Sequence, residues 1–274
     1  MNEQMAFALA SHFPISAGKM GLLSLEHPFF ALANKDMSVY KYESNDGTFG
    51  LEISPGIEGR ATIKDCDFII YLIAKLVAMK KAGELNTDTP VIHVEASEFL
   101  NFAKRGDGGK NYKDLRAMLK RLGNTNYTIT TKSKNGDKEE TRNRTWIDPE
   151  WNSVREKQTK HRELITFEVR PREWWVRTIR ETNQYLTVPQ DFFTIRQALD
   201  RRYWQIARMH ASSSKPFLIS WEKFYNKIGS ETPFDQFRSR LRRKMKLTGS
   251  VQVLDYFITE VDGRMLQITE APSD

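Results

Sequence analysis

Arginine, glutamine and serine side chains gather on one predicted helix near the C-terminal end of the sequence. Residues 233–246 contain six basic residues and a single acid, Asp235. At 100° per residue, the apolar side chains of this segment fall on one narrow face: Phe234, Phe237, Leu241 and Met245. The polar groups lie on or beside the opposite face: Gln236, Arg238, Ser239, Arg240, Arg242, Arg243 and Lys246. Arginine can pair with guanine O6 and N7, glutamine can pair with adenine, and flanking cations hold phosphates, so this helix suits the major groove of DNA. A basic face that is merely solvated is the alternative.

A second basic helix is predicted over residues 111–122, ending at Gly123. Its apolar side consists of Tyr112, Leu115, Met118, Leu119 and Leu122. The basic residues outside that stripe are Lys110, Lys113, Arg116, Lys120 and Arg121. Lysine lacks the planar fork that reads a base, so we expect phosphate contact here more than base reading. Use of this domain for homodimerisation is an equally weighted alternative.

A β-hairpin is predicted after each basic helix. Residues 134–137 and Asp262-Gly263 supply the two turns. Lys132, Lys134 and Arg264 lie at or near the hairpin tips, where they can contact the DNA backbone or the minor groove. A role in solubility alone is the alternative for each of them.

The elements around the basic helices follow the same order in both halves. A long helix is predicted over residues 65–82 and another over 194–211. Each is followed by a short helix, a glycine-containing turn, the basic helix and the hairpin. Phe99 precedes Gly123 by 24 residues, and Phe224 precedes Gly249 by 25. This order predicts an α+β fold of two tandem winged helix-turn-helix domains. We place domain one at 61–185, domain two at 186–274, and an N-terminal extension packed on domain one at 1–60.

Composition agrees with this organisation. The 274 residues are 39% hydrophobic, which is enough for two modest cores. A net charge of +7 favours a polyanionic partner, either nucleic acid or an anionic membrane surface. Cys66 is the single cysteine, and the sequence has no apolar run of membrane-spanning length and no signal-peptide pattern. We therefore expect a cytoplasmic protein without a disulfide.

Residues suited to catalysis do not form a recognisable site. The five histidines are scattered without metal-ligand spacing, and Gly18-Lys19 lacks the upstream glycine and the following Ser or Thr of a phosphate loop. Asp65 and Asp67 fit the start of a helix better than a Mg²⁺ site. We expect no enzyme activity, no metal and no cofactor.

Several stretches, taken in order, resemble the plasmid replication initiator protein A family. They are residues 26–32 (EHPFFAL), 59–67 (GRATIKDCD) with Tyr71, Gly108-Gly109 with Tyr112, Arg121-Leu122 with Thr125 and Thr130, 193–196 (FTIR), 200–203 (DRRY), 206–210 (IARMH), and Gly229-Ser230 with Phe237-Arg238. Residues 211–217 depart from the Cys-Gly and Trp of the family pattern.

That resemblance implies binding to direct repeats (iterons) of double-stranded DNA at a replication origin, help in opening the origin and recruitment of host replication proteins. It also implies that catalysis is absent, that domain two is the main reader of bases, and that domain one alternates between DNA contact and a dimer interface. A winged-helix transcriptional repressor and a non-specific single-stranded DNA-binding protein are the alternatives.

Overall fold

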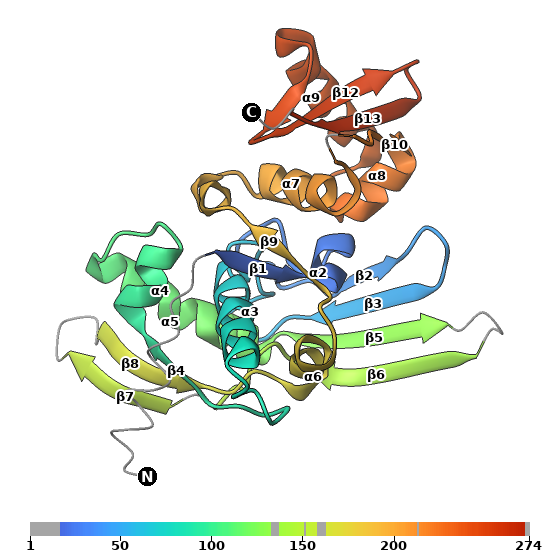
Figure 1. The fold of residues 1–274 in the computed structure, drawn as a ribbon. Helices are drawn as coiled ribbons and strands as arrows, with labels where there is room; N and C mark the ends of the chain where they lie inside the picture. Colours follow the sequence, from blue (N-terminus) through green and yellow to red (C-terminus); the bar gives the residue numbers. More distant parts are fainter. Residues whose placement is uncertain (1–16, 133–136, 151, 158–162, 213, 272–274) are drawn as a thin grey trace.

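The computed structural model describes residues 17–271 except 133–136, 151, 158–162 and 213. The described chain forms two lobes, one above the other in Figure 1. The first lobe runs from β1 to α6, and the second from the 3₁₀ helix η1 to β13. The predicted contact Lys134 lies outside the described residues.

Helix α3 (Cys66–Lys81) is the centre of the first lobe, close to the predicted 65–82. Every residue from Cys66 to Val77 is buried, because this helix is apolar on nearly all sides. Strand β1 (Gly18–Gly21) and the helices α4 (Ala96–Phe102) and α6 (Glu173–Glu181) pack against it. The same lobe contains α2 (Leu22–Glu26), β4 (Ile92–Glu95) and α5 (Gly109–Asn124).

Two antiparallel sheets complete the first lobe. One has the order β2-β3-β5-β6, from β2 (Tyr40–Glu43), β3 (Phe49–Ser54), β5 (Asn126–Lys132) and β6 (Lys138–Arg144). The other has the order β4-β8-β7, with β7 (Asn152–Lys157) and β8 (Glu163–Val169). Leu51 of β3 faces Ile129 of β5, so residues predicted to belong to an N-terminal extension share a sheet with the hairpin that follows α5.

The second lobe places three helices beside a four-stranded antiparallel sheet (Figure 1). The chain enters through β9 (Tyr185–Val188), which pairs with β1, and through η1 (Gln190–Thr194). Then come α7 (Ala198–His210), β10 (Phe217–Ser220), α8 (Trp221–Ile228) and α9 (Phe234–Thr248). The sheet order is β10-β13-β12-β11, from β11 (Val251–Val253), β12 (Tyr256–Val261) and β13 (Met265–Glu270).

Helices combined with antiparallel sheets confirm the general fold class, and two local predictions were wrong. The helix predicted from residue 194 begins at Ala198, because Gln190–Thr194 form η1 and Gln197 is extended. The first strand of the second predicted hairpin is divided between β11 and β12, because Leu254 adopts a turn conformation with φ 50°. Strands β1, β7, β9 and β10 were not predicted.

Candidate nucleic-acid interface

Helix α9 separates an apolar side from a polar side, as its periodicity predicts. Phe237, Leu241 and Met245 are buried, and the Phe237 ring lies 5.3 Å from that of Tyr225 in α8. Gly249 ends the helix in the left-handed conformation, with φ 78°. The exposed predicted contacts on α9 are Gln236, Ser239, Arg240, Arg243 and Lys246. Arg240, Arg243 and Lys246 form no ion pair within the described part of the chain.

Two further arginines of α9 are turned toward the hairpin β12–β13. Arg238 donates from Nη2 to the carbonyl oxygen of Gly263 at 2.7 Å, and Arg242 donates to the same oxygen at 3.0 Å. Arg242 Nε also lies 2.9 Å from Glu260 Oε1. Both guanidinium groups lie over the Trp221 ring, 5.5 and 5.6 Å from its centroid. Arg238 and Arg242 therefore fasten the hairpin to α9.

Glu260 completes this arrangement from the hairpin. It accepts a hydrogen bond from Trp221 Nε1 at 3.0 Å as well as those from Arg242. The hydrogen bonds that Arg242 donates to Glu260 lower the pKa of Glu260 and raise that of Arg242, so the pair stays charged. The hairpin thus has a fixed place beside the exposed face of α9.

The turn of this hairpin has the predicted chemistry. Asp262 and Gly263 have φ values of 53° and 63°, the pair of positive angles that a type I′ turn needs. Arg264 follows directly and is exposed. Arg264 thus lies beside the turn that Arg238 and Arg242 hold.

Helix α5 uses its basic residues differently. Lys110 and Lys113 are exposed, and Lys110 pairs with Asp114 at 3.5 Å. Lys120 lies 3.6 Å from Glu58. Arg116 is half-buried. Lys132 on β5 lies 3.2 Å from Glu43. The basic charge of this lobe is therefore partly neutralised by nearby acids.

Arg121 is turned into the protein. Its Nε and Nη2 atoms donate to the two oxygens of Asp65 at 2.7 and 2.8 Å. Asp65 is buried at the start of α3 and also accepts the backbone N–H of Thr62 at 2.7 Å. The hydrogen bond to Asp65 raises the pKa of Arg121. This arginine joins α5 to α3, a role that residue type and helical spacing do not reveal.

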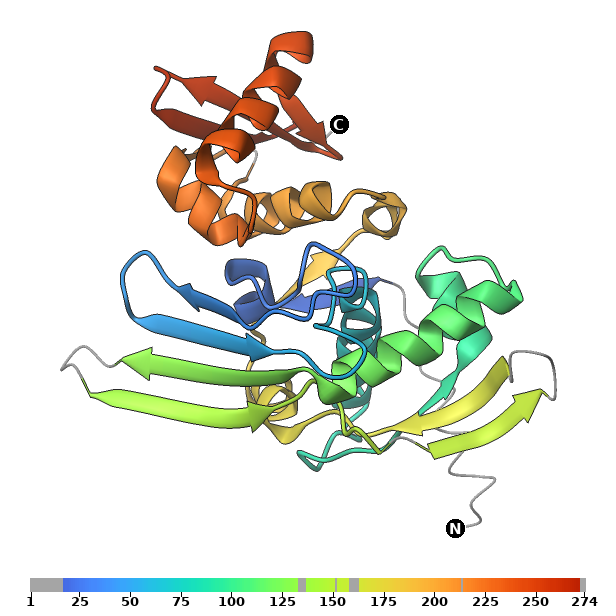
Figure 2. The same cartoon turned by 180° about the vertical axis from the view of Figure 1, so that it is seen from behind.

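Both basic helices face the same side of the molecule. In Figure 2, α5 (green) and α9 (red-orange) lie in front of the elements that they pack on. In Figure 1, both lie behind those elements.

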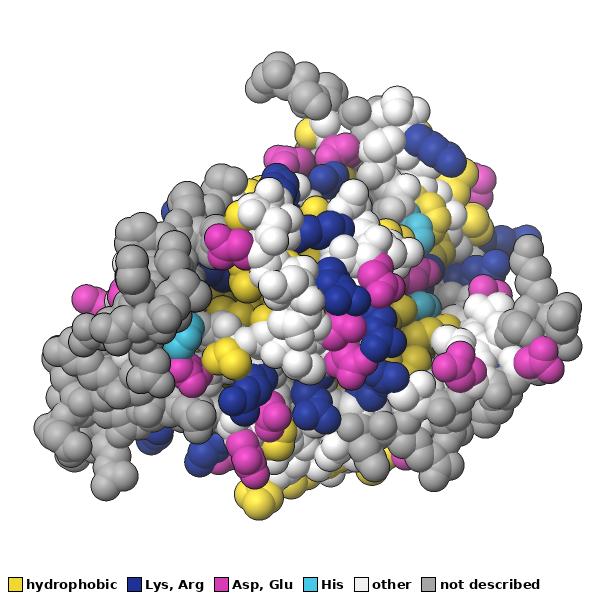
Figure 3. Space-filling model, turned by 60° about the horizontal axis from the view of Figure 1, so that its bottom comes forward, with side chains coloured by type: hydrophobic (Ala, Val, Ile, Leu, Met, Phe, Trp, Pro, Cys, Tyr) yellow, Lys and Arg dark blue, Asp and Glu magenta, His cyan; other side chains and the backbone are white. Residues whose placement is uncertain are grey.

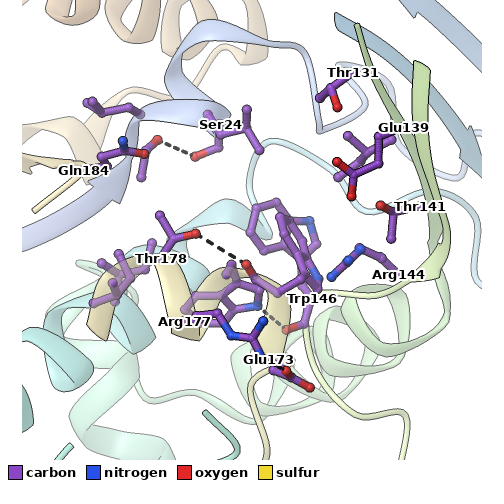
Figure 4. Close-up of a pocket in the computed structure, with 18 residues that line it drawn as sticks. Ser24, Thr131, Glu139, Thr141, Arg144, Trp146, Glu173, Arg177, Thr178 and Gln184 are labelled. Carbon is purple, nitrogen blue, oxygen red and sulfur yellow. Dashed lines mark hydrogen bonds and ion pairs between the residues drawn. The ribbon is translucent and has the colours of Figure 1, made fainter. Parts of the chain in front are cut away.

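A hollow of about 460 Å³ lies between α2, α6 and the strands β5 and β6 (Figure 4). Trp146 and Trp174 line it, and the Arg144 guanidinium lies 5.9 Å from the centroid of Trp174. Burial lowers the pKa of Arg144. Glu173 and Arg177 form an ion pair and also line the hollow. None of the predicted DNA contacts lines it.

In Figure 3, which brings the bottom of the molecule forward, basic and acidic side chains alternate.

The sequence matches the family model described as "Replication initiator protein A" over residues 20–249. The chain belongs to the replication initiator protein A family. A relative from Wigglesworthia glossinidia brevipalpis, named "Putative replication protein", is 31% identical over 241 residues. The alignment covers 88% of this chain and 85% of the relative.

Two solved structures share the fold of this initiator. Both contain domains 2 and 3 of RctB, with TM-scores of 0.59 and 0.54 at 12% sequence identity. They cover 92% and 90% of this chain, and 97% and 95% of the RctB chains. The shared architecture thus includes both lobes of the initiator.

The family match includes all of α5 and α9 and ends at Gly249, the residue that caps α9. The hairpin β12–β13 lies beyond it. Within the described residues of the initiator, no group of acidic, histidine or cysteine side chains could hold a metal ion, and no helix is long and apolar enough to cross a membrane.

Proposed function

We propose that this initiator binds repeated sequences of double-stranded DNA at a replication origin, with α9 as the helix that reads bases. The observation that carries the proposal is the exposed face of Gln236, Ser239 and Arg243, with Arg240 and Lys246 beside it. These groups combine hydrogen-bonding ends for base edges with cations for the flanking phosphates.

The surroundings of α9 fit a helix that enters the major groove. Its apolar side is buried, so its orientation is fixed by the core of the lobe. The β12–β13 hairpin is held to it by Arg238 and Arg242, and Arg264 at its turn is exposed where a neighbouring phosphate would lie. We propose that α7, α8, α9 and the hairpin act as a winged helix-turn-helix.

For α5 we propose a supporting role. Lys110, Lys113 and Lys120 are its exposed cations, and lysine binds phosphate as a point charge. This helix holds the DNA backbone without reading sequence, and homodimerisation through the same lobe is the competing use. We further propose that the initiator is not an enzyme and recruits host replication proteins to the opened origin.

A footprint on the replicon that encodes the protein tests the proposal. We expect protection of direct repeats near the gene, at a spacing of about two helical turns. Protected inverted repeats, with no replication defect on deletion of the gene, would instead indicate a transcriptional repressor. Tighter binding to oligo-dT than to any duplex at matched salt would indicate a single-strand binder, because salt changes affinity for both forms.

A further inference from the structure

The sequence Asp200-Arg201-Arg202-Tyr203 on α7 contains two buried arginines. Arg201 is 3% exposed and Arg202 is 2% exposed. Arginine is almost never fully buried unless its charge is paired or its donors are used. The DNA-contacting face described above does not account for either side chain, so both need another role.

Arg201 reaches from the second lobe into the first. Its Nη1 lies 2.5 Å from Oδ1 of Asp67, a buried residue of α3. Its Nε donates to the carbonyl oxygen of Ile195 at 2.8 Å, and its Nη2 to that of Phe193 at 3.2 Å. Arg105 of the first lobe holds the other oxygen of Asp67 at 2.9 Å. One carboxylate is thus shared by an arginine from each lobe.

Arg202 joins the ends of two helices that belong to different lobes. Its guanidinium donates to the carbonyl oxygens of Leu25 at 2.8 Å and Glu26 at 3.0 Å, at the end of α2. The same group donates to the carbonyl oxygen of Lys227, near the end of α8, at 2.7 Å. A cation at two helix C-termini satisfies carbonyl groups that have no partner within their helices. Burial lowers the pKa of Arg202 to about 10, so the side chain stays charged at neutral pH.

Further polar contacts surround the two arginines at the junction of the lobes. Glu26 of α2 bonds to Lys227 of α8 and to His210 of α7, the latter at 2.6 Å. Burial of Glu26 opposes its ionisation, but the hydrogen bonds from His210 and Lys227 lower its pKa to about 2. Arg60 of the first lobe bonds to Glu231 of the second.

Gly229 lies where the two lobes approach each other closely. It has φ 70°, and a Cβ atom there would lie 2.4 Å from Cβ of Pro28. Helix α9 begins five residues after this glycine, at Phe234. The start of the base-reading helix is therefore next to the junction.

These contacts form a continuous connection between the two basic helices. Arg121 fastens α5 to Asp65 at the start of α3, and Asp67, two residues later, is fastened to Arg201 of α7. Arg202, next along α7, holds the end of α8, from which the chain turns into α9. The helices that face one side in Figure 2 are thus connected through buried, charged hydrogen bonds.

We propose that Arg201 and Arg202 are positioning residues that lock the two lobes, so that α5 and α9 meet DNA at one fixed spacing and helical phase. This inference rests on the proposed function, because it assumes that both helices engage the same duplex. It makes these arginines determinants of which arrangement of a site is recognised, although neither touches DNA.

The test uses the full chain and two duplex probes. The first probe is the repeat defined by the footprint. The second has about 5 base pairs, half a helical turn, inserted between the segments contacted by α9 and α5. These segments are assigned from the protection that Arg243→Ala and Lys113→Ala each remove. We expect the wild-type protein to lose on the order of 100-fold in affinity on the second probe, because simultaneous engagement becomes impossible.

Arg201→Met should bind the first probe more weakly than wild type and lose less than about tenfold on the second, because the lobes can then adjust to one another. Arg105→Gln is the matched control, since it removes a bond to the same carboxylate from within one lobe. This variant should lose as much affinity on the second probe as the wild-type protein does. Arg202→Lys keeps the buried charge but cannot span two helix ends, and it replaces Arg201→Met if that variant does not fold.

The inference would be overturned if Arg201→Met and Arg202→Lys lost as much affinity on the second probe as the wild-type protein does. A wild-type protein that prefers the repeat but is indifferent to the insertion would also overturn it, while leaving base reading by α9 intact. A wild-type protein with no preference for the repeat would instead refute the proposed function. General destabilisation lowers the affinity for both probes alike and leaves the ratio of the two affinities unchanged.

Discussion

Helices α9 and α5 carry similar numbers of basic residues but present them in different ways. On α9, Arg240, Arg243 and Lys246 are exposed and form no ion pair among the described residues. On α5, Arg121 is directed inward to Asp65, and Lys110 and Lys120 each lie near an acid. The difference shows that basic content alone does not identify a helix whose cations are free for a ligand. What matters is which cations remain available after the protein has used some for its own structure.

Arginine has a second use on both helices. Arg238 and Arg242 hold the hairpin beside α9, and Arg121 holds the start of α3 beside α5. A guanidinium group with several fixed donors suits such bracing better than a lysine ammonium. These arginines position the helices, whereas the exposed groups on α9 are the ones that we propose meet DNA.

The largest expected effect is on stability, and it distinguishes Arg121 from the surface lysines of α5. Arg121→Met should lower the free energy of unfolding by about 3–5 kcal/mol, because it leaves the buried Asp65 carboxylate without its main partner. Lys113→Met should change it by less than about 0.5 kcal/mol. Urea unfolding followed by circular dichroism measures both. Equal effects in the two variants would mean that Arg121 is not structural.

Next in size is the effect of Arg243 on DNA binding. Arg243→Ala should cost about 1–3 kcal/mol of binding free energy on the repeat and relax the preference at one base pair, if the side chain pairs with guanine. Competition titrations against duplexes substituted at each position measure this. A uniform loss at all positions would assign Arg243 to phosphate contact.

Arg242 should act through the hairpin. Arg242→Met removes its bonds to Glu260 and Gly263, and we expect a loss of about 1–2 kcal/mol in stability. Amide hydrogen exchange should accelerate in β12 and β13 while α5 is unchanged. Acceleration spread over both lobes would show that the contact does not act locally.

The smallest effect is expected for Lys113. Lys113→Ala should weaken binding to every duplex by a similar factor, below about 1 kcal/mol, and reduce the slope of log affinity against log salt by about 1. Affinities measured at several salt concentrations test this. An unchanged slope would favour the use of α5 in dimerisation.

Local sequence patterns predicted much of the fold because periodicity and turn residues act over short distances. The apolar face of α9, the Asp262-Gly263 turn and the long buried helix α3 were predicted in this way. Strands β1 and β9 were missed because each has four residues and its partner lies more than 160 residues away. The turn at Leu254 lacks the glycine or asparagine that usually marks positive φ.

The exposed face of α9 was predictable from the sequence, but which of its arginines the protein uses for its own structure was not. Helical projection placed Gln236, Ser239 and Arg243 on an outer face, and the structure exposes all three. The same projection could not separate them from Arg238 and Arg242, because the partners of those arginines, Gly263 and Glu260, lie 18–25 residues away on the hairpin. Arg201 and Arg202 stood out in the sequence only as a family-like motif, because burial of a charge depends on partners from distant segments.

The most direct test of base reading by α9 is selection of binding sites from a pool of random duplexes. Wild-type protein should enrich one motif that recurs as direct repeats beside its gene. The triple variant Gln236→Ala/Ser239→Ala/Arg243→Ala should stay folded, since all three side chains are exposed, and should enrich no motif. Enrichment of the same motif by both proteins would contradict the account, because sequence would then be read by another part of the initiator.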